Sequence, residues 1–196
     1  PSDTEMGGGQ VGAAIYIWGS ILTCTLALVI SVPFSLATAV FMTQIAPKLG
    51  ERIIRPAVEI FVGIPSVVYG WVGLVVLVPL LQRIFDLPHG QSVLAAGIVL
   101  SVMIYPTITS VSADAIRSVN NKYVEGAYGL GSTRWQMIYK VLLPAALPGI
   151  LTAIVLGLAR AFGEALAVSM VIGKMRAFPD SLLAPTNSLT AAIASD

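Results

Sequence analysis

The chain has 196 residues, of which 56% are hydrophobic and 11% charged, with a formal net charge of +1 and a mean hydropathy of +0.86. Soluble domains carry about 25% charged residues, so this composition predicts a membrane protein. The near-zero net charge, without a basic tract, argues against a nucleic-acid partner. The single Cys24 excludes an internal disulfide, and its place among Leu and Thr indicates a small apolar filler.

Four apolar runs are long enough to cross a bilayer core of about 30 Å, which takes roughly 20 helical residues. They extend from Ile15 to Met42, from Pro56 to Leu81, from Ser92 to Ser112 and from Leu142 to Ile172. The expected fold class is all-α: a polytopic bundle of membrane helices over residues 15–196, preceded by an extracytoplasmic segment over residues 1–14. The polar ends of the chain predict that it is the core of a longer protein.

Proline and glycine interrupt these runs at Pro33, at Gly63-Ile64-Pro65 and at Tyr105-Pro106. Proline removes a backbone donor and kinks a helix, and neighbouring helices or water must then satisfy the freed carbonyls. Such helices are expected to pack around a cavity or to move. The alternative is that these residues are simply common in membrane helices.

Basic residues are distributed unevenly among the connecting segments, and short loops rich in them face the cytoplasm. The segments after the first and third runs carry seven: Lys48, Arg52, Arg55, Arg117, Lys122, Arg134 and Lys140. The other connector and the C-terminal segment carry three: Arg83, Lys174 and Arg176. Both ends of the chain are therefore expected outside the cytoplasm, and the loop over residues 116–141 inside it.

Two charges lie within the fourth apolar run. Arg160 and Glu164 are four residues apart, so on a continuous helix they share one face and can pair. An arginine at the centre of a bilayer costs on the order of 3 kcal/mol, which predicts that this face lines the bundle interior or a water-filled route. We expect a role in the translocation pathway or its gating. The alternative is a purely structural ion pair.

The loop between the third and fourth runs is polar and punctuated by glycine. Asn120 or Asn121 can cap a short helix, Gly131 can end it sharply, and Ser132 can cap a second helix that carries Trp135. The result is an elbow of two short helices, which can transmit a displacement by a soluble partner to both adjoining spans. Glu125 would supply an anionic contact, whereas Gly126 and Ala127 would keep the buried face small. The alternative is an amphipathic loop without a partner.

This loop carries a resemblance to a known family. Its residues Glu125-Gly126-Ala127, Gly131, Val141, Leu143 and Pro144 match the cytoplasmic coupling motif of permease subunits of ABC-type importers. That motif reads Glu-Ala-Ala, three residues, Gly, nine residues, Ile, one residue, Leu-Pro. The departures are Gly126 for Ala and Val141 for Ile. The resemblance implies that Glu125, Gly126, Ala127, Gly131, Leu143 and Pro144 serve the coupling to an ATPase.

Three further segments resemble the phosphate-importer branch of that superfamily, and within it the C-type permease subunit. They are Gly63–Gly70, Leu156–Glu164 and Asn187–Thr190. The resemblance implies the type I ABC importer permease fold, with an additional span at each end of the complete subunit. The implied partners are a second permease subunit in a heterodimer, a dimer of ATP-binding cassette ATPases and an extracytoplasmic phosphate-binding protein. The implied location is a bacterial or archaeal plasma membrane.

We therefore expect the core of a permease subunit of an ATP-driven phosphate importer. An enzymatic activity is not expected, because the sequence has neither a phosphate-binding glycine-lysine loop nor a carboxylate cluster for a metal, and no cofactor is implied. Another oxyanion, such as sulfate or molybdate, is the alternative within the class. Outside it, Arg160 and Glu164 could form the anion and proton site of a secondary transporter. An intramembrane enzyme is disfavoured, because His89 is the only histidine and belongs to an outer turn.

Overall fold

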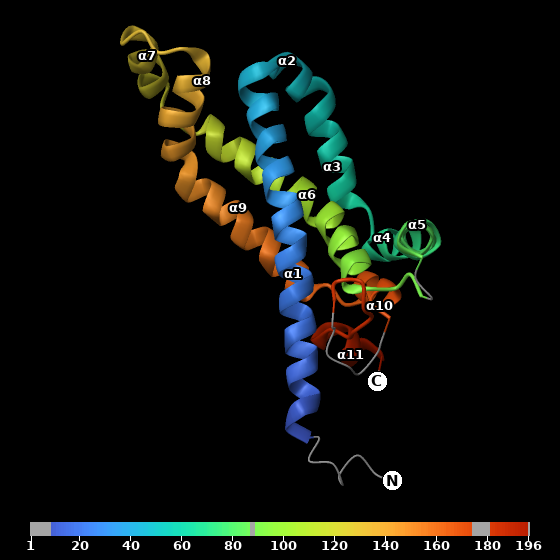
Figure 1. Ribbon diagram of the computed structural model, residues 1–196. Coiled ribbons are helices and arrows are strands. Elements are labelled where there is room, and N and C mark those ends of the chain that lie inside the picture. Colours follow the sequence, from blue (N-terminus) through green and yellow to red (C-terminus); the bar gives the residue numbers. More distant parts are fainter. Residues whose placement is uncertain (1–8, 87–88, 174–180, 196) are drawn as a thin grey trace, which may run out of the picture. The chain divides into compact units, whose positions relative to one another are not determined.

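The computed structural model describes residues 9–86, 89–173 and 181–195, which form helices joined by turns and short irregular segments (Figure 1). The α-helices are, in chain order, α1 (Gly9–Val40), α2 (Pro47–Leu49), α3 (Arg55–Gly63), α4 (Ser66–Val72), α5 (Val78–Phe85), α6 (Val93–Arg117), α7 (Asn121–Gly129), α8 (Arg134–Met137), α9 (Leu143–Gly163), α10 (Leu166–Val171) and α11 (Leu189–Ser195). Four π-helical turns in the described residues continue or join them: η2 (Phe41–Ile45), η3 (Gly50–Ile54), η4 (Gly73–Leu77) and η5 (Ile138–Leu142). The predicted all-α class is confirmed.

Four helical stretches in the described part of the chain are long and apolar enough to cross a membrane. They are Ala14–Ile45, Ser66–Phe85, Val93–Arg117 and Arg134–Gly163. The predicted number of spans is confirmed, and the first and third begin close to their predicted positions. Pro33 and Pro106 lie inside α1 and α6 without ending them.

The predicted second span, from Pro56 to Leu81, is wrong in its boundaries. Helix α3 ends at Gly63, and α4 begins at Ser66 after Pro65, whose backbone is extended at φ −58° and ψ 139°. The residue before a proline is driven out of the helical region. Ile64 therefore cannot continue α3, which ends at Gly63, and α4 begins anew at Ser66. The Gly63-Ile64-Pro65 group is a complete break and not a kink.

The predicted fourth span, from Leu142 to Ile172, is also wrong as a single helix. Helix α9 ends at Gly163, and α10 begins at Leu166. The carboxylate of Glu164 accepts a hydrogen bond from the Ala167 amide at 3.0 Å. A side-chain acceptor of this kind satisfies an N–H that has no partner at a new helix start, which explains why the apolar run divides here.

The chain forms two compact units, and the three longest helices contribute to both. One unit comprises residues 1–30, 64–104 and 158–196, and the other comprises residues 31–63 and 105–157. In the first unit, α4 and α10 approach each other closely at Gly70. A Cβ atom at this position would lie 2.7 Å from the Ala167 Cα atom, so this approach requires glycine.

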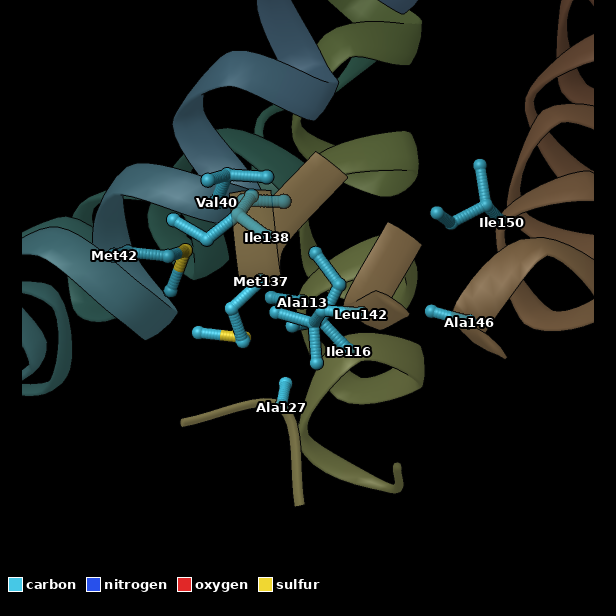
Figure 2. Packing of buried hydrophobic residues seen from close by; sticks show 11 residues of the cluster. Val40, Met42, Ala113, Ile116, Ala127, Met137, Ile138, Leu142, Ala146 and Ile150 are labelled. Atoms are coloured by element: carbon cyan, nitrogen blue, oxygen red, sulfur yellow. The ribbon is translucent and has the colours of Figure 1, made fainter. Parts of the chain in front are cut away.

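The second unit has a buried apolar cluster that joins the ends of several helices. Its members come from α1, η2, α6, α7, α8, η5 and α9: Ala39, Val40, Met42, Ala113, Ile116, Ala127, Met137, Ile138, Leu142, Ala146 and Ile150. Figure 2 shows Ile116 and Met137 close to Ala127. Ile116, Met137 and Leu142 are each only 1% exposed. This cluster fixes the loop between α6 and α9 on the rest of the unit.

Candidate functional site

The loop over residues 116–141, called here the Glu125 loop, begins with a capped helix. The side chain of Asn120 accepts a hydrogen bond from the Lys122 amide at 3.0 Å, and α7 follows from Asn121 to Gly129. Of the two predicted caps, Asn120 is therefore the one that acts. An Asn at this position satisfies one of the free N–H groups of the first turn, which allows a helix of only nine residues to start at a defined point.

Helix α7 ends in a Schellman motif around Gly131. The Gly131 amide donates to the Tyr128 carbonyl at 2.9 Å, and the Ser132 amide donates to the Ala127 carbonyl at 3.1 Å. Gly131 has φ +79°, the left-handed conformation that glycine adopts without a steric penalty. The prediction that Gly131 ends this helix sharply is confirmed. The four-residue spacing from Ala127 to Gly131 is the spacing that these two hydrogen bonds require.

The second short helix, α8, is capped by Thr133, and the predicted cap Ser132 is wrong. Thr133 Oγ1 accepts from the Gln136 amide at 3.4 Å, and Gln136 Oε1 accepts from the Thr133 amide at 2.9 Å. Ser132 is occupied elsewhere, since its hydroxyl donates to the Ala127 carbonyl at 2.7 Å. The spacing of Thr133 and Gln136 is that of a capping box, a signal in the sequence that identifies the right residue.

The residues of the coupling motif divide into a buried and an exposed group. Ala127 is 8% exposed and belongs to the apolar cluster, against which Leu143 also packs. Glu125 and Gly126 are exposed, and a Cβ atom at Gly126 would meet nothing within 4 Å. Pro144 is exposed in the first turn of α9, which directly continues the π-helical turn η5. The buried group positions α7, and Glu125 remains available to a partner.

Several large apolar and aromatic side chains of the Glu125 loop are exposed. Those exposed are Tyr123 at 61%, Tyr128 at 45%, Leu130 at 91%, Trp135 at 66% and Tyr139 at 63%. The sequence analysis did not single out this set, although their recurrence along a short polar loop is a usable signal. Exposed aromatic groups are enriched where proteins bind other proteins. The exposed side chains of the loop are thus both apolar and, at Glu125, anionic.

The structure also places Arg160 and Glu164, both half-buried, in the first unit. The prediction that they share a face of one continuous helix is wrong, because α9 ends at Gly163. Glu164 instead caps α10 through its carboxylate, and its carbonyl accepts a hydrogen bond from the Thr190 hydroxyl at 2.9 Å. Negative charge is favourable at a helix N-terminus. Arg160 lies in the last turn of α9.

The fold and this loop define a class: a multi-span helical membrane subunit with a short-helix elbow between two spans. The chain belongs to the family of binding-protein-dependent transport system inner membrane components. The sequence model of that family matches residues 31–189. The MetNI methionine ABC transporter, solved in inward-facing conformations, has a similar chain with a TM-score of 0.63 and 25% identity. The match covers 87% of this chain and 76% of that one. The fold is the type I ABC importer permease fold.

Three relatives of known name are similar over most of this chain. A probable ABC transporter permease protein, YqgH of Bacillus subtilis, is 51% identical over 193 residues, which cover 98% of this chain and 62% of the relative. The phosphate transport system permease protein PstC of Pasteurella multocida is 40% identical, covering 94% and 64% respectively. A probable PstC protein of Methanocaldococcus jannaschii is 35% identical, covering 93% and 63%. The chain thus spans less than two thirds of the length of these relatives.

Proposed function

We propose that the chain is the core of the transmembrane permease subunit of an ATP-driven phosphate importer, and that the Glu125 loop couples it to a separate ATPase. One observation carries the coupling role. A nine-residue helix, fixed by an Asn120 cap, a Schellman end at Gly131 and the burial of Ala127, leaves Glu125 exposed on a loop that also exposes aromatic side chains. The names of the PstC relatives support phosphate as the transported anion.

The geometry supports a mechanism for the coupling. Helix α7 is joined to α6 by only three residues, and Ala127 packs in the same buried cluster as Ile116 of α6 and Met137 of α8. A displacement of α7 by the ATPase would therefore move the ends of α6 and α9 together. Alternating access follows when those spans reorient. The subunit itself hydrolyses nothing in this scheme.

The proposed assembly contains partners beyond the ATPase dimer. They are a second permease subunit in a heterodimer and an extracytoplasmic phosphate-binding protein, and the coupling loop faces the cytoplasm with both ends of this chain on the other side. Within the membrane, Arg160 and Glu164 are proposed pathway or gating residues. The two half-buried charges at the break between α9 and α10 support this role, because burying them without function would be costly.

Phosphate uptake by intact cells tests the proposal. The full-length protein, with its partners, should restore uptake of labelled phosphate to a bacterium that lacks its own phosphate importers. Excess sulfate or molybdate should leave this uptake unchanged. Inhibition by either oxyanion, or uptake of that oxyanion in place of phosphate, would favour the alternative of a permease for another oxyanion. Uptake that persists when the ATPase is inactivated would favour a secondary transporter.

A further inference from the structure

Five charged side chains link the segment after α1 to the end of α6, all within the second unit. Arg117 Nη2 lies 2.6 Å from Glu51 Oε1, and Arg55 Nη2 lies 3.7 Å from Asp114 Oδ1. Three further ion pairs in the described residues complete the set: Arg55 with Glu59 at 3.2 Å, Arg117 with Asp114 at 3.5 Å and Arg55 with Glu51 at 3.9 Å. We call these five side chains the charge brace.

In the brace, the segment after α1 and the end of α6 each contribute an arginine that contacts an acid of the other. Arg55 of α3 reaches an acid on α6, and Arg117 of α6 reaches an acid on η3. These side chains are 28% to 61% exposed, so each isolated pair would contribute little. However, each arginine also has an acidic partner on its own segment, which holds its guanidinium in place for the cross-contact. Shared partners of this kind make a network rather than separate surface pairs.

Arg117 connects the charge brace to the start of the Glu125 loop. Arg117 is the last residue of α6, and only Ser118, Val119 and the cap Asn120 separate it from α7. The preceding residue, Ile116, is 1% exposed in the apolar cluster that contains Ala127. The last turn of α6 is therefore held on its apolar side by the cluster and on its polar side by the brace.

We propose that Glu51, Arg55, Asp114 and Arg117 are positioning residues for coupling: they fix the last turn of α6, so that a displacement of α7 is passed into the span. Without the brace, the three residues that join α6 to α7 would absorb part of the displacement of α7. This inference rests on the proposed function of the Glu125 loop. It assigns a role to the segment after the first span, which lies more than 50 residues before that loop in the sequence.

Charge exchange between Glu51 and Arg117 tests the proposal in the full-length permease assembled with its partners. Arg117→Glu and Glu51→Arg, each alone, should lower the number of phosphate ions transported per ATP by about fivefold or more, the scale of typical coupling between sites. The double exchange should restore part of this ratio, because it rebuilds the shortest cross-contact with reversed polarity, whereas each exchanged side chain then faces a like charge on its own segment, Arg55 or Asp114. Arg52→Glu is the matched control: Arg52 is exposed in the same segment, takes no part in the brace and should leave the ratio unchanged.

If a reversed charge prevents assembly, the neutral variants Arg117→Gln and Glu51→Gln replace the charge-reversed ones. Both should also lower the number of phosphate ions transported per ATP. A native ratio in all single variants would overturn the proposal, and so would a double exchange that assembles with a ratio no higher than that of the single variants.

A second readout needs neither phosphate nor ATPase and so separates this inference from the proposed function. A spin label on Lys122→Cys, in a Cys24→Ser background, should become more mobile with Arg117→Glu and less mobile again in the double exchange, which rebuilds the shortest cross-contact. Arg52→Glu should leave it unchanged. If the native complex fails to transport phosphate yet the label responds in this way, the proposed substrate is wrong and the brace stands. Unchanged mobility with Arg117→Glu would overturn the brace.

Discussion

The Ser132 amide donates a hydrogen bond to the Ala127 carbonyl at 3.1 Å and so ties the buried end of α7 to the start of the next turn. This bond is possible because the intervening Gly131 adopts φ +79°. Ala127 packs in the apolar cluster, and Glu125, two residues earlier, is exposed. The residue that fixes the loop and the residue that we propose contacts the ATPase therefore lie on one short helix with a defined end.

Gly131→Val should weaken the end of α7. A β-branched residue at a left-handed position costs roughly 1–2 kcal/mol relative to glycine, so amide hydrogen exchange in α7 should become faster and coupled uptake should fall. Gly129→Ala is the control, because a Cβ atom there would meet nothing within 4 Å and its φ is not positive. Slow exchange in both variants would contradict the account of the Schellman motif.

Glu125→Lys should reduce both uptake and co-purification of the ATPase while leaving membrane insertion intact, because it inverts a charge on an exposed surface. Glu125→Gln should have a smaller effect, since it removes the charge without opposing it. Arg52→Glu provides a charge reversal of the same size outside the motif. Native co-purification together with native uptake in Glu125→Lys would remove the basis for assigning this residue to the ATPase contact.

The orientation is testable with two exposed positions on different loops. Leu130→Cys on the Glu125 loop and His89→Cys after α5 are made singly in a background without Cys24. On intact cells, an impermeant thiol reagent should label the cysteine at 89 and not the one at 130, as the seven-to-three distribution of basic residues predicts. Of the residues counted, Lys174 and Arg176 lie outside the described part of the structure. Reversed labelling would overturn the orientation and the coupling proposal with it.

Two substitutions of Glu164 separate the effect of its charge from its effect on the start of α10. Glu164→Gln retains an oxygen acceptor for the Ala167 amide, whereas Glu164→Ala removes this hydrogen bond at a cost of about 1 kcal/mol, typical of a single hydrogen bond. If the charge serves the pathway, Glu164→Gln should abolish uptake in a complex that still assembles, and Arg160→Gln should do the same. Native uptake in Glu164→Gln with a loss only in Glu164→Ala would reduce the role of Glu164 to that of a cap.

Features that depend on neighbouring residues could be predicted from the sequence. The number of spans follows from the length of the apolar runs, and the ends of α7 follow from Asn120 and Gly131, which satisfy local backbone geometry. The cap of α8 was misplaced because Ser132 and Thr133 are adjacent hydroxyl residues. The capping-box spacing of Thr133 and Gln136 distinguishes them in the sequence, and in the fold the Ser132 hydroxyl donates to the Ala127 carbonyl instead.

Features that depend on the folded chain could not be predicted. Hydropathy does not register the break at Glu164, because the run stays apolar on both sides of it. The charge brace was also missed, since Glu51 and Arg117 are far apart in the sequence and only the folded unit brings them to 2.6 Å. The recurrence of aromatic residues along the Glu125 loop is visible in the sequence, but their exposure depends on which face of the loop packs in the cluster.

The central claim, that this subunit couples ATP hydrolysis to phosphate import through the Glu125 loop, is tested most directly by the ATPase rate of the reconstituted full-length complex. The account predicts a rate that rises only when the receptor protein carries phosphate, and a rise that is lost with Glu125→Lys but kept with Arg52→Glu. A rate that rises equally with an empty receptor, or a Glu125→Lys complex that responds like the native one, would contradict it.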